Sequence, residues 1–336
     1  MLRRIVSLLL ALSLFILLAA TLVFVRSYSA PGPGQTRRLL FEIGTGQSVR
    51  AIAENLREAG ILRRTWPFLA GYRIFHAGEK IRAGEYELSL PLPPRRVLST
   101  LLDGRIYLRP ITIPEGLTVR EVDDLIRGAA FPSTGSFLAA CGDTAPIGSW
   151  DAGAKNLEGY LFPDTYRFPK GVPAGTMALT MVDQFRKVFG EAGLRRAAGL
   201  RMSVRQVVTL ASLIEKETSI PEERPLVSAV FHNRLRMGMK LDCDPTVIYA
   251  LKLDNLYLGR LLAKDLKFAS PYNTYVSPGL PPGPICNPGR DAIQAALHPG
   301  AVDYIYFVAS GGGRHAFNRS YADHLRAVKK YRWKNR

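Results

Sequence analysis

The chain begins with a long apolar run. No charged residue occurs from Ile5 to Val25, which is a stretch of 21 residues bounded by arginines on both sides. About 20 apolar residues suffice for a helix to cross a bilayer, and the run exceeds the apolar core of a typical signal peptide. We therefore predict one uncleaved transmembrane helix over residues 5–25, with residues 1–4 in the cytoplasm. A long signal peptide is the alternative.

A pattern of strand, turn and helix occurs twice after this run, 70 positions apart. FEIGTGQSVRAIAENL begins at Phe41, and ITIPEGLTVREVDDLI begins at Ile111. In each copy, alternating residues predict a short strand and a glycine predicts a turn. Ser48 and Thr118 are placed to cap the amphipathic helices that follow. This βα opening resembles that of LysM-type wall-binding modules. A common βα unit without a ligand is the alternative.

Composition and pattern together predict the domain organisation. Residues 26–38 are rich in proline and glycine and are predicted to form a linker. Residues 39–110 are predicted to form a first subdomain. Residues 111–336 are predicted to form a larger domain, which opens with the second βα copy over residues 111–130. Because helical and strand patterns are mixed along the chain, we expect an α+β fold.

Helical patterns dominate the larger domain. Helices are predicted over residues 174–190, 203–217 and about 221–238, and Ser203 opens the second of them with a capping-box pattern. The later stretch SPYNTYVSPGLPPGPICNPG has too many prolines and glycines for a regular element. Its tyrosines favour an ordered loop over a disordered one.

The charge of the chain points to an anionic partner. Lys and Arg number 45 against 28 Asp and Glu, which gives a formal net charge of +17. Such an excess suits nucleic acid, anionic lipid or an acidic polymer. The apolar run places the rest of the chain outside the cytoplasm, and no helix carries a basic stripe that could read bases. We therefore expect no nucleic acid and favour contact with the cell wall or the membrane.

No motif for a metal or cofactor is present. Cys141, Cys243 and Cys286 form no CxxC pair and no metal-ligand spacing, and His315 has no evident metal partners. There is no phosphate-binding loop, no HExxH and no G-x-S-x-G. We predict neither a metal nor a cofactor, and we expect buried thiols.

The stretch ASLIEKETS carries two glutamates, Glu215 and Glu217, two positions apart. In a helix such neighbours point about 200° apart, so they cannot share one cleft as a paired-carboxylate site. Glu215 shares its face with small side chains such as Ala211 and Ser212, which leave room for a ligand. Helical geometry therefore favours Glu215 as the functional one. Two ordinary surface residues are the alternative.

Several long motifs carry a family resemblance. LEGYLFPDTY, ASLIEKET, VFHNRLRMGMKLDCDPTVIYAL, SPYNTY with GLPPGPICNPG, and YFVASGGGRHAFN occur in this order. They resemble the endolytic murein transglycosylases of the MltG/YceG-like family. The resemblance implies a single-pass inner-membrane enzyme with its catalytic domain in the periplasm. It would cut peptidoglycan between N-acetylmuramic acid and N-acetylglucosamine, leaving 1,6-anhydro ends. It also implies a LysM-like subdomain, a role in ending or trimming nascent strands, and wall-synthesis partners such as penicillin-binding proteins.

The resemblance places the family's catalytic glutamate on the first Glu of EKET, here Glu215, as general acid and then base. Burial would lift its pKa toward the working pH. Because the C6 hydroxyl of the muramic sugar attacks, no second carboxylate is required, and Glu217 is predicted to give support. The remaining predicted site residues are Tyr275 and Asn273 as catalytic residues, and Glu158, Tyr160, Asp164, Tyr166, Glu217, Asp244, Thr246, Tyr272 and Asn318 as substrate-binding residues.

Other interpretations stay open for these residues. Asp164 and Asp244 are also typical turn or helix caps, and the tyrosines could simply pack a proline-rich loop. A non-catalytic wall-binding scaffold would need no functional glutamate. A water-using muramidase would need a second carboxylate about 5–9.5 Å from the first, for which Asp164 and Asp244 are the candidates.

Overall fold

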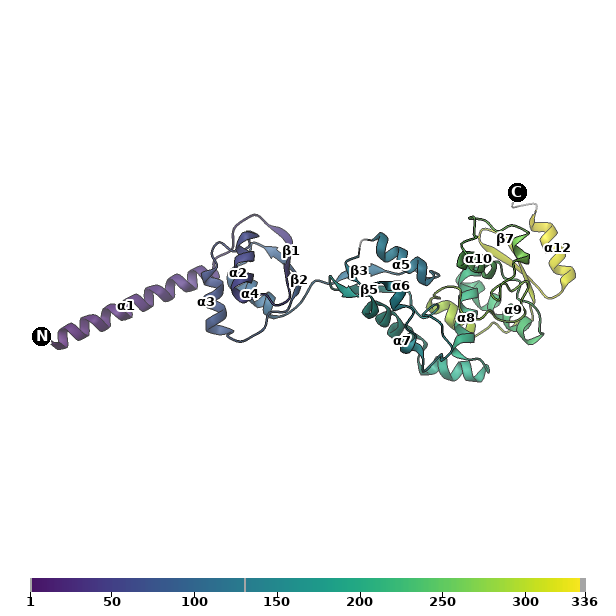
Figure 1. The fold of residues 1–336 in the computed structure, drawn as a ribbon, viewed down its shortest axis with the longest axis horizontal. Helices are drawn as coiled ribbons and strands as arrows, with labels where there is room; N and C mark the ends of the chain where they lie inside the picture. Colours follow the sequence, from purple (N-terminus) through teal and green to yellow (C-terminus); the bar gives the residue numbers. More distant parts are fainter. Residues whose placement is uncertain (1, 130, 333–336) are drawn as a thin grey trace. The chain divides into compact units, whose positions relative to one another are not determined.

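The computed structural model describes residues 2–129 and 131–332, and it is a mixture of helices and strands (Figure 1). The chain forms two compact units. One holds the chain up to Arg109 together with Arg167–Lys170, and the other holds Pro110–Tyr166 together with the chain from Gly171 onward. Each sheet in the described residues has two strands. The predicted α+β class is confirmed.

Helix α1, Leu2–Ser29, is long and apolar enough to cross a membrane. It is consistent with a membrane anchor or a signal sequence. The helix extends beyond Val25, where the predicted span ends, because its last turns pack against α3, Trp66–Phe75. The ring of Tyr28 stacks on that of Phe75 with centroids 6.1 Å apart.

The irregular connection after α1 is shorter than the linker predicted over residues 26–38. Its first four residues belong to α1, and strand β1, Arg37–Ile43, already begins before its end. β1 pairs antiparallel with β2, Gly84–Leu90. Inward-facing side chains of the two strands, such as Phe41 and Leu88, form the core of the first unit. Helices α2, Val49–Glu58, and α4, Pro94–Leu102, contribute to the same core.

Both copies of the repeat form the predicted strand, turn and helix. The Ser48 hydroxyl accepts a hydrogen bond from the N–H of Ala51 at the start of α2. At the start of α5, Val119–Gly128, Thr118 and Glu121 form a full capping box. Gly46 and Gly116 have φ values of +76° and +79°, a left-handed conformation that favours glycine. The strands find different partners, since β1 pairs with β2, whereas β3, Arg109–Thr112, pairs with β5, Thr165–Phe168.

The second unit is mainly helical. Its other elements are β4 Ser133–Thr134, α6 Phe137–Ala140, β6 Val172–Pro173, α7 Ala174–Gly199, α8 Val204–Glu217, α9 Arg224–Arg236, α10 Asp244–Leu253, α11 Arg290–Leu297, β7 Tyr306–Gly311, β8 Arg314–Asn318 and α12 Tyr321–Arg332. Helix α7 breaks at Gly190, where the sequence predicted its end, and then resumes. The break has φ 54° and ψ −177°, which no helix accommodates.

Helix α8 lies at the centre of the second unit and packs against α9, α10 and α11. Ser203 and Gln206 form the predicted capping box at its start. Its residues from Val207 to Ile214 are all buried, so the middle of the helix has no solvent face. It ends at Thr218, whose backbone is extended, and Pro221 opens a single 3-10 turn before α9. Glu215 and Glu217 therefore lie in the last turn of a helix whose preceding residues are fixed by the core.

Loss of the α8 cap should weaken the second unit. We expect Ser203→Ala to lower the free energy of unfolding by about 1 kcal/mol, and the melting temperature by about 2 to 4 °C. Ser203→Thr retains a capping hydroxyl and should behave as wild type. Thermal unfolding of the detergent-solubilised chain, followed by circular dichroism, measures both. An unchanged melting temperature in Ser203→Ala would mean that packing alone sets this helix end.

Candidate active site

The two glutamates at the end of α8 meet different neighbours, as helical geometry requires. Glu215 faces α11 and the turn before α5. Glu217 faces the segment that leads into α10, where it contacts Cys243 and lies near Asp244. The pair is therefore two separate sites and not one paired-carboxylate centre.

Glu215 is held in a network of charges. Its carboxylate accepts a hydrogen bond of 3.0 Å from the N–H of Gly289 and lies 3.8 Å from the guanidinium of Arg224. The same guanidinium also contacts Glu115 and Asp291. Burial raises the pKa of Glu215, but the Gly289 N–H and Arg224 favour its ionised form. These contacts join α8, α9 and α11, so Glu215 stabilises the fold around the site.

Glu217 has a different environment. Burial raises its pKa to about 7, and the nearby Asp244 carboxylate adds to the rise. The Cys243 thiol donates a hydrogen bond to the Glu217 carboxylate and lowers the pKa in part, as does the more remote charge of Arg234. The residue as a whole is half-buried, as is Glu215. A carboxylic acid that holds its proton near neutral pH suits general acid catalysis.

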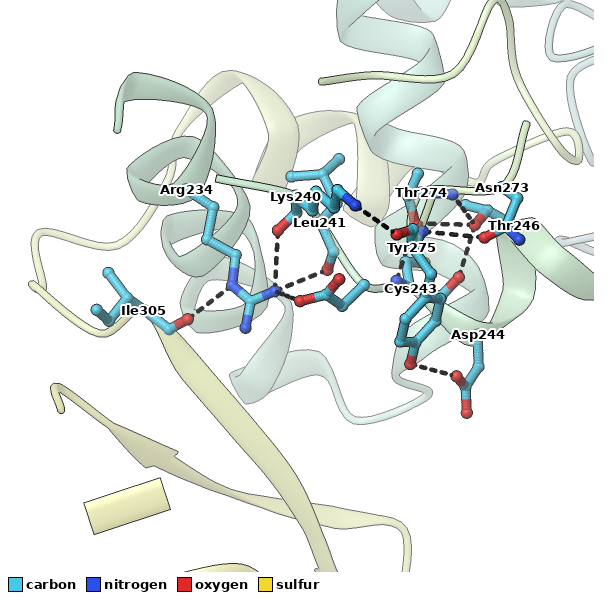
Figure 2. A network of polar contacts seen from close by, with 11 residues as sticks. Arg234, Lys240, Leu241, Cys243, Asp244, Thr246, Asn273, Thr274, Tyr275 and Ile305 are labelled. Atoms are coloured by element: carbon cyan, nitrogen blue, oxygen red, sulfur yellow. Dashed lines mark hydrogen bonds and ion pairs between the residues drawn. The ribbon is translucent and has the colours of Figure 1, made fainter. Parts of the chain in front are cut away.

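The segment that faces Glu217 is fixed by Arg234 of α9, as Figure 2 shows. The Nη1 of Arg234 donates to the carbonyls of Lys240 and Leu241 and to the carboxylate of Asp242, at 3.0 to 3.1 Å. Its Nε donates to the carbonyl of Ile305 at 2.7 Å. Four contacts from one buried side chain thus position the residues before α10.

A second segment, residues 273–275, packs against residues 240–244 (Figure 2). The N–H of Cys243 donates to the Thr274 hydroxyl, and Lys240 donates to the carbonyl of Tyr275. The Tyr275 hydroxyl donates to the Asp244 carboxylate at 2.6 Å. Burial and this carboxylate raise the pKa of Tyr275, so its hydroxyl stays protonated. Tyr275 and Asp244 therefore lie in the same cluster as Glu217.

Two predicted site residues lie beneath this cluster and support it. Asn273 and Thr246 are fully buried. The amide of Asn273 donates to the carbonyls of Leu266 and Phe268, and its oxygen accepts from the N–H of Tyr275. The Thr246 hydroxyl bonds to Cys243 and Thr274. The sequence predicted Asn273 as catalytic and Thr246 as substrate-binding. Neither side chain reaches solvent, and both support the two segments.

Three more predicted residues line separate cavities in the second unit. Glu158 lies between a cavity of about 490 Å³ and an adjoining one of about 250 Å³, and Tyr160 and Tyr272 line the smaller one. Glu158 accepts hydrogen bonds from the N–H of Val119 and the hydroxyl of Tyr249. Burial raises the pKa of Glu158 to about 8.

The remaining predicted residues contact neither the Glu217 cluster nor these cavities. The Asp164 carboxylate accepts from the N–H of Thr165 and the side chain of Gln184. Tyr166 is buried, and its hydroxyl donates to the carbonyl of Phe162. Asn318 donates to the carbonyl of Ala316 in the β7–β8 hairpin. Their contacts are those of turn and hairpin residues.

The structure adds residues that sequence reasoning did not select. Arg234 and Cys243 both lie within the motif VFHNRLRMGMKLDCDPTVIYAL, and each has a partner outside it, Ile305 for Arg234 and Glu217 for Cys243. Glu223 is a third such residue. Its carboxylate lies 2.7 Å from the Nδ1 of His315. It also accepts a hydrogen bond from the hydroxyl of Thr218, the residue directly after Glu217. Cys141, Cys243 and Cys286 are buried and unbridged, as expected. Across residues 2–129 and 131–332, no group of His, Cys, Asp or Glu side chains could hold a metal ion.

The fold and the site together define the class of protein. It is an α+β protein with an apolar N-terminal helix and two half-buried glutamates at the end of a buried helix. A family model described as YceG-like matches residues 41–330, and the chain belongs to this YceG-like family.

Similar proteins agree with this assignment. The chain is 33% identical over 305 residues to a Bacillus subtilis protein named endolytic murein transglycosylase, covering 86% of this chain and 83% of the other. A Streptococcus pneumoniae protein of the same name is 30% identical over 317 residues, and the match spans 85% of this chain but 57% of that longer protein. The crystal structure of a yceG-like protein from Listeria monocytogenes has a TM-score of 0.58 at 31% identity, covering 87% of this chain and 99% of the other.

The thiol beside Glu217 should tune its proton affinity. We expect Cys243→Ala to raise the pKa of Glu217 above about 7, because the substitution removes a hydrogen bond to the ionised form. Cys243→Ser retains a donor and should keep the pKa near the wild-type value or lower it. Difference infrared titration of the carboxyl bands, with Glu217→Gln to assign the signal, measures the shift.

Cys141→Ala is the matched control, because Cys141 is also buried but lies near Glu158 and Asp123. It should leave the Glu217 titration unchanged. An equal titration in wild type and Cys243→Ala would contradict a role of the thiol.

Proposed function

We propose that this protein is a membrane-anchored endolytic peptidoglycan transglycosylase, with Glu217 as its general acid and base. The observation that carries the proposal is the position of Glu217 at the end of α8, beside Cys243 and Asp244, where burial raises the pKa of its carboxyl to about 7. Membership of the YceG-like family and relatives named endolytic murein transglycosylase support the substrate and the reaction. The formal charge of +17 suits an acidic wall polymer.

The proposal moves the catalytic role from Glu215, where the sequence motif placed it, to Glu217. Glu215 has a cation and a backbone donor beside its carboxylate, and both favour the charged form that cannot donate a proton. Glu217 lacks such a direct cation, because the donors of Arg234 are directed at carbonyls and Asp242. We therefore assign proton donation to Glu217, whose neighbours favour its protonated form more than those of Glu215 do.

The reaction follows from one carboxyl group. Protonated Glu217 gives its proton to the glycosidic oxygen between the muramic and glucosamine sugars, and the C1–O bond breaks through an oxocarbenium-like state. The Glu217 carboxylate then takes the proton of the muramic C6 hydroxyl as O6 bonds to C1. The products are an anhydro end and a free hydroxyl end, no water is consumed, and the acid is restored. Tyr275 and Asp244, which lie in the same cluster as Glu217, would contact the sugars beside the scissile bond.

The location of the enzyme follows from α1. We propose that α1 is an uncleaved anchor in the cytoplasmic membrane, with the N-terminus in the cytoplasm and the rest in the periplasm. Residues 39–110 are proposed to act as a LysM-like wall-binding subdomain. In this setting the enzyme would end or trim nascent strands beside wall-synthesis proteins, including penicillin-binding proteins.

Product analysis of two matched variants tests the catalytic assignment. Glu217→Gln should lower the rate at which anhydro ends form by at least ~100-fold, because general acid catalysis is lost. Glu215→Gln should keep most of the turnover and instead destabilise the fold by about 1 to 3 kcal/mol. Mass spectrometry of digests of purified peptidoglycan, with melting curves for both variants, separates these effects.

Full activity in Glu217→Gln, together with loss of activity in a folded Glu215→Gln, would assign the general acid to Glu215. Absence of fragments from folded wild-type protein would favour a wall-binding scaffold. The first outcome contradicts the choice of Glu217, and the second contradicts the enzymatic activity.

The pH dependence of the reaction should report the same group. We expect kcat/KM to fall as the pH rises through about 7, because the acid form of Glu217 is lost. The fall should move to higher pH in Cys243→Ala. Initial rates on one peptidoglycan preparation from pH 5 to 9 give the profile. A flat profile across that range would contradict a Glu217 acid.

One observation favours hydrolysis as a second candidate. Asp244 lies close enough to raise the pKa of Glu217, so a second carboxylate is available to activate water. Asp164 is bound elsewhere, to Thr165 and Gln184. A hydrolytic end is heavier than an anhydro end by one water, so the same mass spectra distinguish the two reactions.

A further inference from the structure

The second unit contains two adjoining cavities that the proposed reaction does not use. The larger, of about 490 Å³, is lined by α5, α6 and α10, and the smaller, of about 250 Å³, by α10 and the proline-rich loops. Both are lined by Asn156, Glu158, Tyr249 and Leu253. The volume of the larger one is typical of small-ligand pockets. The two cavities therefore adjoin across a shared wall.

The lining has an apolar floor and polar groups at its rim. Val119, Leu138 and Cys141 line the larger cavity, and Tyr272 with several prolines lines the smaller one. Tyr249 and Tyr272 pack together, with ring centroids 5.0 Å apart. Such a surface fits the aliphatic and amide groups of a short peptide.

The free charges of this site are positive. Lys252 pairs with Glu121 at 2.7 Å, and Arg205 pairs with Asp151 at 2.9 Å. Asp124 pairs with Arg127 outside the cavity. Burial raises the pKa of Glu158 to about 8, so it adds no negative charge at neutral pH.

Arg120 and Lys155 remain after these pairs. Arg120 lines the larger cavity and Lys155 the smaller one, both are exposed, and neither has an ion pair with any described residue. A ligand with carboxylates spaced along an apolar chain would satisfy both.

The site lies beside the proposed reaction centre. Asp244, next to Glu217, begins α10, and Lys252 of the larger cavity lies eight residues further along the same helix. At 1.5 Å per residue, the rise between them is about 12 Å. The loop before the proline-rich segment supplies Tyr275 to the Glu217 cluster and Tyr272 to the smaller cavity. A group attached to a muramic sugar at the reaction centre is thus within reach.

We propose that these cavities bind the stem peptide that the muramic sugar carries, with Arg120 and Lys155 taking its carboxylates. The proposal rests on the proposed transglycosylase function, because it identifies a part of that substrate. It makes the enzyme sensitive to the peptide as well as to the glycan. Strands whose peptides have been removed would lose this contact and keep the reaction at Glu217.

The test compares peptide-bearing glycan strands with the same strands stripped by an amidase. The double variant Arg120→Ala/Lys155→Ala of the full chain should lower kcat/KM about five- to tenfold on peptide-bearing strands and leave it unchanged on stripped strands. The control Lys187→Ala/Arg195→Ala removes the same charge from exposed positions on α7, outside both cavities. It should leave kcat/KM unchanged on both substrates.

An equal loss on both substrates, or no loss on peptide-bearing strands, overturns the proposal. Calorimetric titration of the wild-type chain with the amidase-released peptides tests the cavities without turnover. The peptides should bind, and should bind more weakly to the double variant. Absence of binding to wild type overturns the peptide site, whereas absence of anhydro ends overturns only the transglycosylase function.

Discussion

The buried guanidinium of Arg234 fixes the geometry on which the candidate active site depends. It donates to the consecutive residues Lys240, Leu241 and Asp242 and to the carbonyl of Ile305, 71 residues away. Its Nε and Nη1 thus join the segment before α10 to the region around β7. It holds the segment before α10 in place and leaves little of its charge for Glu217. Asp242 in this segment has φ +47°, a strained conformation for a residue with a side chain, which the arginine contact helps to hold.

The contrast between the two glutamates shows how partners decide the role of a carboxyl group. Both lie in the last turn of α8, and burial raises the pKa of both. Arg224 and the N–H of Gly289 offer Glu215 direct partners for its charged form. Glu217 instead receives a weak thiol donor and the repulsion of Asp244. The first arrangement suits a structural ion pair and the second a proton donor.

Local signals in the sequence predicted the elements well. The capping residues Thr118 and Ser203 mark helix starts because their bonds are made within four residues. The roles of the glutamates could not be predicted in this way. Small neighbours along the helix favoured Glu215, but Gly289 and Cys243, which lie elsewhere in the chain, determine the environment of each carboxylate. Burial of Asn273 and Thr246 likewise depends on the meeting of two distant segments. The family motifs identified the region and placed the acid on Glu215, whereas the environments of the two carboxylates lead us to propose Glu217.

The stacking of Tyr28 on Phe75 has a consequence for where the enzyme can work. With α1 in the bilayer, the first unit has no flexible tether at its base, because the helix passes directly into contact with α3. Under the proposed anchoring of α1, the first unit would stay close to the lipid headgroups. Mature wall layers further out would be beyond its range, and newly made strands, still attached to lipid, would pass directly by it. The anchor would thereby restrict the protein to recently synthesised strands.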